Sequence, residues 1–532
     1  MPPLGPVSVA TCVHEYTDFD VEVIDENNYK GELDHSAIQA QRPAEFVGFY
    51  GGLTSTIPRL YTVAQEYKNM GAVTIAGGVH MHALPDEALD NGIDYVLDGE
   101  GEYRLPNLLE TLTRGRDVDS IPGLIFRRDG RTVRTIKQEP LSDLNGLPDP
   151  DFGLLKNLKR KVRFIPVSRT RGCNFSCEFC SVKQHLGPCR SGSPQATCRQ
   201  FVNHAEAGYK VFFVVDDNFV QDPDGTKELC RMLIDYKKRT GKKFDIVVQV
   251  RVDAARDTEM LELMKEAGVS TLCIGYESPI EEDLRNMKKG MSVQKLEEYT
   301  KILRSYGFYI HGMFIFGYPS FKDSTCRLTM SMKERAECYL DFIRRCKIDT
   351  IQVMKPVPLP GTVLRQRLEA ENRVFPQSLV GWDKYDGNWL CFQPDEGHSA
   401  KDLQNYATWI MKKVYHPWQI AKFLYLIPNY PIDLAFYTAL ETWRGVRKYF
   451  QENSLSELLR RSLRHHMRSS LGFAQTALAN ARQAGAKKLR NAKLKSVGSL
   501  IYKSWKRRFR KERFYDVLEA ATRWFQSGRA PQ

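Results

Sequence analysis

The sequence lacks the features that mark membrane-spanning and secreted proteins. Its 532 residues contain no run of eighteen apolar residues, so we expect no membrane-spanning helix. The first residues do not resemble a secretion signal, and twelve cysteines without such a signal are typical of a reducing compartment. We therefore predict a cytoplasmic protein whose thiols serve metals or packing instead of disulfides.

Most of the chain also lacks a strong net charge. The net charge is +13, but residues 441–532 hold 22 Lys and Arg against 6 Asp and Glu, which leaves the first 440 residues at about −3. The length allows two or three domains, and 42% hydrophobic with 27% charged residues is an ordinary globular composition. The basic character therefore belongs to the C-terminal part alone.

One stretch, Thr170-Arg-Gly-Cys-Asn-Phe-Ser-Cys-Glu-Phe-Cys-Ser181, organises the rest of the sequence. It places three thiols, Cys173, Cys177 and Cys180, within eight residues. Cysteine thiolates hold iron–sulfur clusters, and a cubane with three protein ligands leaves one iron open for chemistry. A structural zinc site, which prefers four ligands in spaced pairs, and three unrelated buried thiols are the alternatives.

The spacing Cys-x3-Cys-x2-Cys, with Phe179 before the last cysteine, resembles the signature of the radical S-adenosylmethionine (AdoMet) enzymes. The resemblance implies a 4Fe-4S cluster whose open iron binds the amino and carboxylate groups of AdoMet, with Phe179 beside the cofactor. An electron would split the sulfonium, and the adenosyl radical would take a substrate hydrogen. An external electron donor of the flavodoxin or ferredoxin type is therefore expected.

Residues 1–140 are predicted to form a doubly wound parallel sheet. Short β-branched runs at 21–24, 46–49, 73–76 and 95–97 alternate with helical patterns. Ligands of such sheets bind at the carboxyl ends of the strands. Residues that could contact a large flat ligand gather there, although any Gly-Gly pair also fits a tight turn: Gly52, Thr54, Ser55, Gly77, Gly78, His80, Gly99 and Glu100.

Three segments of this domain, Ala76-Gly-Gly-Val-His80, Leu84-Pro-Asp-Glu87 and Asp98-Gly-Glu-Gly-Glu102, resemble the cobalamin-binding domain found ahead of many radical AdoMet enzymes. The resemblance implies bound cobalamin. The sequence departs from the family pattern in two places. It opens at Pro2-Pro-Leu-Gly5, where the family has a first strand beforehand. It also lacks Asp-x-His-x-x-Gly, the motif that supplies the lower-axial histidine in other cobalamin proteins. His80 is a candidate cobalt ligand, with a loop histidine bonded to backbone as the alternative.

Residues 161–365 are predicted to form a partial β/α barrel, after a proline-containing connector over 120–160 whose linker proper is 141–160. Six strands are expected: 163–170, 210–215, 244–250, 271–275, 308–316 and 350–357. Barrel chemistry gathers at the C-terminal ends of strands. The resemblance implies that the polar residues there bind AdoMet, each with a structural role as the alternative: Asp216, Asp217, Gln249, Arg251 and Glu277.

The C-terminal third is predicted to contain a cap over the barrel mouth at 366–415 and a basic helical extension at 416–532. The cap includes Trp382-Asp-Lys-Tyr-Asp-Gly-Asn-Trp389, which could exclude water from a radical. Aromatic residues among Lys and Arg in the extension fit an interfacial membrane helix, a nucleic-acid contact by charge alone, or a solvated basic helix. We predict peripheral contact with the inner membrane surface and no nucleic-acid partner.

These observations together predict a cobalamin-dependent radical AdoMet enzyme, a C-methyltransferase acting on an unactivated carbon of a lipid-like or other secondary metabolite. The expected fold class is α/β, with a Rossmann-like cobalamin-binding domain, a six-stranded partial barrel and a helical C-terminal region. Two alternatives stay open. One is a radical AdoMet oxidoreductase or cyclase that does not use cobalamin, and the other is a non-catalytic membrane- or nucleic-acid-binding protein.

Overall fold

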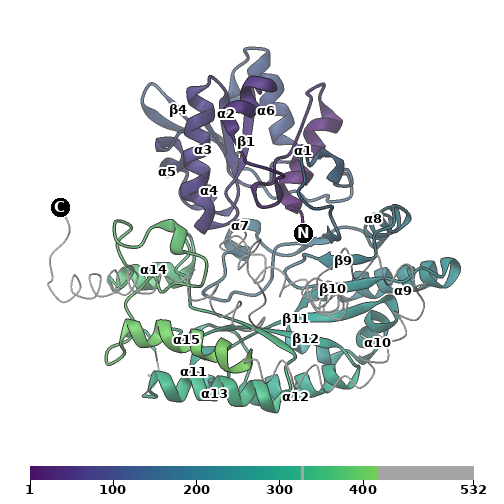
Figure 1. The fold of residues 1–532 in the computed structure, drawn as a ribbon, viewed down its shortest axis with the longest axis vertical. Coiled ribbons are helices and arrows are strands. Elements are labelled where there is room, and N and C mark those ends of the chain that lie inside the picture. The colour runs from purple at the N-terminus through teal and green to yellow at the C-terminus, as the bar shows by residue number, and fades with distance from the viewer. Residues whose placement is uncertain (325–328, 416–532) are drawn as a thin grey trace, which may run out of the picture.

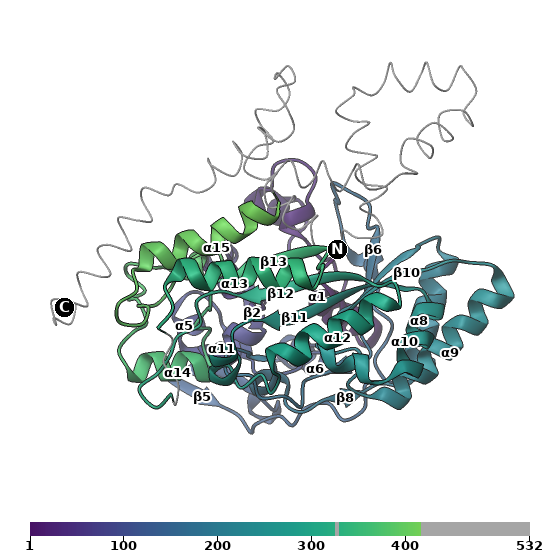
Figure 2. The same cartoon turned by 90° about the horizontal axis from the view of Figure 1, so that it is seen from below.

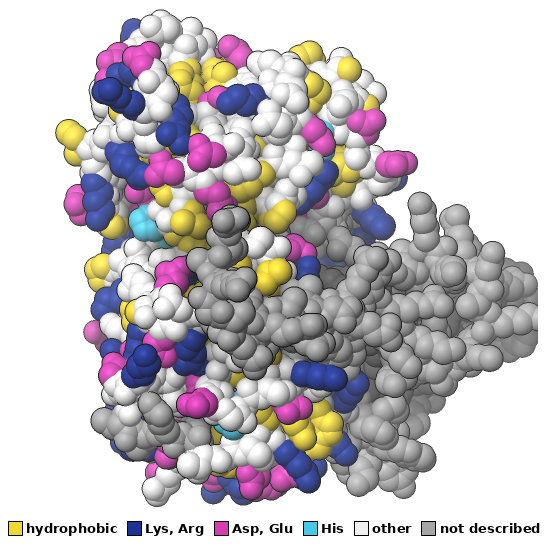
Figure 3. All heavy atoms as spheres, turned by 90° about the vertical axis from the view of Figure 1, so that its left-hand side faces the viewer, with side chains coloured by type: hydrophobic (Ala, Val, Ile, Leu, Met, Phe, Trp, Pro, Cys, Tyr) yellow, Lys and Arg dark blue, Asp and Glu magenta, His cyan; other side chains and the backbone are white. Residues whose placement is uncertain are grey.

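Two α/β domains lie one above the other in the computed structural model, which describes residues 1–324 and 329–415. Figure 1 shows the N-terminal sheet and its helices at the top and the larger barrel below. The predicted basic extension lies outside the described residues. On the face drawn in Figure 3, Lys and Arg side chains are interspersed with Asp and Glu, as expected from the near-neutral charge of this part of the chain.

The first sheet has the strand order β1-β2-β3-β4-β5. Strands β1 (Phe46–Tyr50), β2 (Val73–Gly77) and β3 (Tyr95–Leu97) are parallel, which confirms three predicted strands. Helices pack against them through apolar residues at helical spacing. These helices are α1 (Leu4–Tyr16), α2 (His35–Gln41), α3 (Ile57–Asn69), α4 (Val79–Ala83), α5 (Pro85–Asp90) and α6 (Arg104–Thr113).

Two predictions for this domain were wrong. Residues 21–24 form no sheet strand, because Val23 makes only an isolated bridge with Leu155. The predicted connector instead contributes the antiparallel strands β4 (Leu124–Arg128) and β5 (Arg131–Arg134) to the sheet. Asp129 and Gly130 have φ values of 50° and 73°, the left-handed conformation that a tight hairpin turn requires. An Asp-Gly pair between two strand-like runs was the signal that the composition of the connector obscured.

The barrel sheet confirms all six predicted strands. Its order is β13-β12-β11-β10-β9-β6, every neighbouring pair is parallel, and β6 and β13 are its two edges, so the barrel is open. The strands are β6 (Phe164–Val167), β9 (Val211–Val214), β10 (Asp245–Val250), β11 (Val269–Glu277), β12 (Tyr309–Ile315) and β13 (Thr350–Met354).

The two faces of this sheet differ. One face packs on a ring of helices through a large apolar core (Figure 2). The helices are α8 (Pro194–Glu206), α9 (Pro223–Thr240), α10 (Thr258–Ala267), α12 (Val293–Ser305) and α13 (Met332–Arg345). The inner face carries a small cluster of Phe213, Val247, Cys273 and Met313. Because side chains alternate along a strand, Gly275 of β11 shares the inner face with Cys273.

Residues 366–415 do not form one compact cap. Helix α14 (Val363–Ala370) leads into a loop that contacts the first domain through a short turn at Trp382–Lys384, and α15 (Ala400–Val414) packs against α13 and β13. In the part of the chain that the structure describes, no helix is long and apolar enough to span a bilayer.

Candidate functional site

The cysteine loop lies where the two domains meet. It follows β6 and the short strand β7 (Thr170–Arg171), and β7 pairs with β8 (Arg190–Ser191), so the chain returns to its starting point after α7 (Val182–Leu186). Figure 1 shows α7 between the first domain and the barrel. The carboxyl ends of the six parallel strands meet at the same edge, which we call the barrel mouth.

The loop starts at a position where only glycine fits. Gly172 has a φ of 86°, and a Cβ there would lie 2.5 Å from the carbonyl oxygen of Pro188. The backbone amide of Cys173 donates to Gly187 (3.2 Å), and that of Cys189 donates to the Asn174 side chain (3.0 Å). The first cysteine is therefore held against the returning strand.

The three thiols are half-buried and unoxidised. Burial raises the pKa of Cys177 and raises that of Cys180 to about 12, while the charges of Lys289 and Arg251 act in the opposite direction on Cys177. Such thiols ionise when they bind a metal ion, because the metal's charge replaces the lost solvation. This donor set suits iron.

No three His, Cys, Asp or Glu side chains within residues 1–324 and 329–415 surround a point that could hold a single metal ion. A mononuclear zinc site needs four such ligands around one ion. In a cubane cluster each thiolate binds a different iron, so the three sulfur atoms need not converge.

Asp216 is built into the turn that leads to the loop. Its side chain is buried, and one oxygen accepts hydrogen bonds from the backbone amides of Arg169 (2.8 Å) and Thr170 (3.0 Å). Burial raises the pKa of Asp216. These contacts favour a structural role over the predicted contact with AdoMet.

Asp217, its neighbour, points the other way. The residue has exposed surface, yet desolvation by the surrounding protein raises its pKa to about 6, with the charge of Asp216 as the second cause. Its charge acts on Cys180. Asp217 is therefore an accessible carboxylate facing the cysteine loop, and it can receive an ammonium group.

Arg251 and Gln249 brace the mouth. The Arg251 guanidinium lies 3.7 Å from the ring centroid of Phe175 in the cysteine loop and donates to the carbonyl of Lys289 (3.2 Å). The Gln249 amide makes a long contact of 3.4 Å with the carbonyl of Asp216. Both residues lie at the carboxyl end of β10, and their contact with AdoMet stays a prediction.

Glu277, the last residue of β11, has an unusual backbone. Its φ is 64°, and the pairing of β11 with β12 shifts between Gly275 and Glu277. The carboxylate pairs with the buried Lys289 ammonium at 2.9 Å. The predicted residue Phe179 packs nearby, edge-on to Tyr318 at 6.4 Å. Lys289 was missed, since nothing in a Lys-Lys-Gly sequence distinguishes a buried lysine from a surface one.

The glycines of the first domain form two loops in mutual contact, residues 51–55 and 77–78, which we call the glycine loops. The Gly51 amide donates to Gly77 (2.7 Å), and Gly78 has a φ of 108° with its Cβ position only 2.9 Å from the Gly51 backbone. A Cβ at Gly52 would overlap the ring of Tyr50. These glycines are thus required by close backbone packing as well as by any ligand.

The edge beside the glycine loops exposes apolar surface. Tyr50 and Leu53 are 52% and 66% exposed, and the half-buried Ser55 and the buried Thr54 hydroxyl complete the loop. Large apolar side chains left exposed at strand ends mark a binding surface. The edge therefore fits a broad planar ligand such as a corrin.

His80 is not free to bind cobalt in this structure. It is 1% exposed; Nδ1 lies 3.3 Å from the Thr54 hydroxyl and Nε2 lies 3.3 Å from the Glu87 carboxylate. Its ring packs edge-on against Trp382, whose indole donates to Glu87 at 3.0 Å. His80 therefore connects a glycine loop to the loop after the barrel, and its hydrogen bonds are to side chains instead of backbone.

Glu100 belongs to an ion-pair cluster between the domains. It accepts from Arg171 and Arg190, both at 2.8 Å, and Arg171 also pairs with Glu102 at 2.7 Å. We call these four residues the interdomain ion-pair cluster. Gly99, with a φ of 104°, makes the turn that precedes Glu100. Glu100 was predicted to bind cofactor, but its contacts give it the role of docking the first domain onto the cysteine loop.

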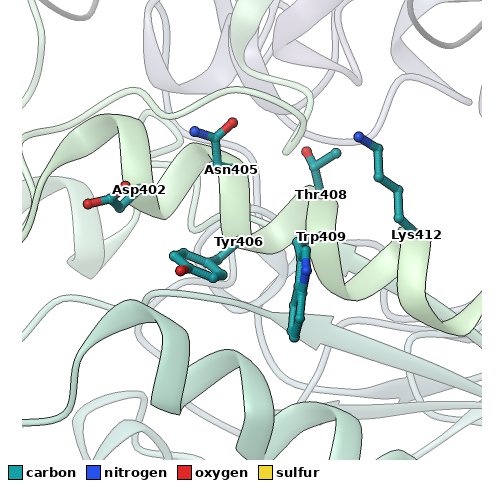
Figure 4. Close-up of a pocket in the computed structure, with 6 residues that line it drawn as sticks. All are labelled: Asp402, Asn405, Tyr406, Thr408, Trp409 and Lys412. Atoms are coloured by element: carbon teal, nitrogen blue, oxygen red, sulfur yellow. The ribbon is translucent and has the colours of Figure 1, made fainter.

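A separate hollow of about 330 Å³ lies along α15 (Figure 4). It contains no residue of the cysteine loop, the barrel mouth or the glycine loops, so it is not the candidate site. Its lining residues all come from one helix: Asp402, Asn405, Tyr406, Thr408, Trp409 and Lys412.

Two family descriptions match the chain at the expected places. The radical SAM superfamily matches residues 167–332, and the B12-binding domain matches residues 1–109. The match to the B12-binding domain starts at the first residue, although the structure opens on α1 instead of a strand.

Curated relatives include methyltransferases. An uncharacterized methyltransferase of Pyrococcus horikoshii is 29% identical over 72% of this chain and 81% of its own. The bacteriochlorophyllide d C-12(1)-methyltransferase of Chlorobaculum tepidum is 26% identical over 78% of this chain and 82% of its own. The hopanoid C-2 methylase of Rhodopseudomonas palustris is 26% identical over 70% and 65%. An anaerobic magnesium-protoporphyrin IX monomethyl ester cyclase of Rubrivivax gelatinosus is 25% identical over 70% and 67%.

The fold is shared with the cobalamin-dependent AdoMet radical enzyme OxsB. Its structure with aqua-cobalamin and AdoMet bound matches 97% of this chain and 82% of its own, with a TM-score of 0.61 at 15% identity. A B12-binding domain ahead of a radical SAM domain defines a radical AdoMet enzyme whose cofactors are a 4Fe-4S cluster, AdoMet and cobalamin. The chain thus contains a radical SAM domain and, ahead of it, a B12-binding domain.

Proposed function

We propose that this enzyme is a C-methyltransferase that acts on an unactivated carbon of a lipid-like or other secondary metabolite. One observation carries the proposal. Arg171, two residues before Cys173, pairs with Glu100 and Glu102 of the first domain, so the cysteine loop and the B12-binding domain share one boundary. A methyl donor and a radical generator would have to approach the same substrate there.

In this proposal Cys173, Cys177 and Cys180 hold the cluster, and the glycine loops hold cobalamin. When bound, the cluster supplies the electron that cleaves AdoMet and cobalamin carries the methyl group. The chain's own residues bind and orient: Asp217 receives the ammonium group of AdoMet, and Glu277 accepts hydrogen bonds from it. Buried contacts between the domains keep water away from the reacting groups.

Two of the relatives, named for bacteriochlorophyllide and hopanoid, support a lipid-like substrate, whereas another is named for cytidylyl-2-hydroxyethylphosphonate, a polar one. The cyclase among the relatives supports a second candidate function, a radical AdoMet cyclase, while the B12-binding domain argues against the alternative without cobalamin. All of the named relatives are enzymes, so we do not carry the non-catalytic alternative further.

The products of AdoMet distinguish the two candidates. After anaerobic reconstitution of the full chain and addition of a flavodoxin or ferredoxin reductant, a methyltransferase forms 5′-deoxyadenosine together with S-adenosylhomocysteine and contains cobalt. A cyclase forms 5′-deoxyadenosine without S-adenosylhomocysteine. Zinc instead of iron in the reconstituted protein would contradict both.

We also propose a cytoplasmic location with peripheral membrane contact, supported by the basic residues after position 440. Flotation of the full chain with anionic and with neutral liposomes tests this contact. We expect binding to anionic liposomes that salt weakens. Equal recovery at the bottom of both gradients would remove the membrane from the proposal.

A further inference from the structure

The residue missed by sequence reasoning, Lys289, lies at the centre of the barrel mouth. Its side chain is 9% exposed, and its ammonium pairs with the Glu277 carboxylate, which is 11% exposed. A buried charge is costly without a partner, so each member of this pair requires the other. The proposed function assigns no role to Lys289.

The pair lies over Gly275 on the inner face of the barrel. A Cβ at Gly275 would overlap the Glu277 carboxylate and would come within 3.3 Å of the Lys289 ammonium. The carboxylate therefore folds back over a residue that has no side chain, toward the inside of the barrel. Because Glu277 has a φ of 64°, a conformation that is costly for a glutamate, surrounding contacts must hold it.

The turn that carries Lys289 is also tied to the cysteine loop. The Glu178 amide donates to the carbonyl of Met287 (3.1 Å), and Arg251 donates to the carbonyl of Lys289 (3.2 Å). Lys288 has a φ of 53° and pairs with Glu178 at 2.9 Å, but its side chain is 66% exposed. Two successive lysines thus point to opposite sides, one to solvent and one into the mouth.

We propose that Lys289 is a positioning residue for AdoMet: it holds the Glu277 carboxylate over Gly275, where that carboxylate accepts hydrogen bonds from hydroxyl or ammonium groups of AdoMet. This inference rests on the proposed function only in taking AdoMet as the ligand. The lysine acts through Glu277 and does not itself touch the reacting atoms.

AdoMet affinity of the reconstituted full chain, measured by anaerobic equilibrium dialysis with labelled AdoMet, tests the proposal. We expect Lys289→Met to weaken binding at least tenfold and Lys289→Arg to restore it to within about threefold, since an arginine can keep the ion pair. Lys295→Met, the same change at an exposed lysine of α12, is the matched control and should bind as the wild type does. Gly275→Ala should weaken binding because it displaces the carboxylate.

A double-mutant cycle separates positioning from direct contact. If Lys289 acts through Glu277, adding Lys289→Met to Glu277→Gln costs no further AdoMet affinity. The proposal would be overturned if the double variant lost the product of the two single losses in affinity. A Lys289→Met variant that binds AdoMet like the wild type would also overturn it. The double variant has no unpaired buried charge, so this comparison decides the matter even if Lys289→Met alone does not fold. Wild type that binds AdoMet but transfers no methyl group would contradict the proposed function and leave this inference intact.

Discussion

The strand ends of the two domains use their polar residues differently. In the first domain, the His80 ring bonds to Thr54 and Glu87 and packs on Trp382 of the loop after the barrel, while Glu100 pairs with Arg171 and Arg190 beside the cysteine loop. At the barrel mouth, Asp217 stays exposed beside the cysteine loop. Polar groups of the first domain thus contact the cysteine loop and the loop after the barrel, whereas Asp217 at the barrel mouth is accessible.

This contrast follows from the kind of ligand each edge suits. A corrin is large and flat, and it is bound by apolar surface and close backbone approach, which glycines and exposed Tyr50 and Leu53 provide. AdoMet carries an ammonium, a carboxylate and hydroxyl groups, so its site needs charged partners. Mutations at each edge should therefore affect one cofactor and spare the other.

The largest expected effect is at the cysteine loop. Cys180→Ala removes one of the three predicted cluster ligands, and we expect 5′-deoxyadenosine formation to fall more than about 1,000-fold, as expected when the group that supplies the electron is lost. Cys189→Ala, at a half-buried cysteine outside the motif, is the control and should keep its iron. Undiminished AdoMet cleavage by Cys180→Ala would show that the cluster is held elsewhere.

The next effect is at the glycine loops. Gly78→Ala places a side chain at a φ of 108° and against the Gly51 backbone, a strain of about 1–3 kcal/mol. We expect cobalamin content, measured from the visible spectrum, to fall about tenfold or more while AdoMet cleavage continues. Gly31→Ala, at a φ of 91° with open space around it, controls for backbone strain alone. If Gly78→Ala lowered cobalamin content and AdoMet cleavage equally, the two edges would not be separable.

The boundary between the two edges should respond more modestly. Arg171→Met leaves Glu100 and Glu102 buried without their shared partner. Breaking a buried ion pair lowers the free energy of unfolding by about 3–5 kcal/mol. We expect a smaller loss here, because Arg190 still pairs with Glu100. We expect a lower melting temperature and faster proteolysis near residues 141–160. Arg127→Met, which breaks an exposed pair with Asp90, should change neither.

The smallest effect is a pH dependence from Asp217. Desolvation raises the pKa of Asp217 to about 6, so the carboxylate takes up a proton and loses its charge as the pH falls through that value. AdoMet affinity should therefore rise several-fold between pH 5 and pH 7 in the wild type and stay flat in Asp217→Asn. The stability contribution has the opposite sign, because a carboxyl whose folded pKa lies above its unfolded value of 3.8 destabilises the protein increasingly from about pH 4 to pH 6. A flat binding curve in the wild type would remove Asp217 from the AdoMet site.

Sequence patterns predicted strands well where burial is two-sided and turns are regular. All six barrel strands were found because β-branched runs recur between helical segments. The run at 21–24 failed because alternation over four residues cannot tell a sheet strand from an isolated bridge. The 124–134 hairpin was not predicted, because the prolines around it are typical of a connector and the Asp129-Gly130 turn is a short signal.

Roles within the site were less predictable than positions. Asp216 and Asp217 are neighbours with the same side chain, yet one is buried on backbone amides and the other faces the mouth. Lys288 and Lys289 show the same divergence. In both pairs the backbone turns each residue into a different environment, which identical side chains cannot reveal.

The amino-acid sequence by itself determined the class of chemistry, because three thiols at a characteristic spacing and a sheet rich in glycine at its strand ends are local features of the chain. Only the tertiary structure decided which charges serve a ligand and which join the domains. The ion pair of Arg171 with Glu100 unites residues far apart along the chain, and its strength, like that of Lys289 with Glu277, depends on burial that folding alone creates.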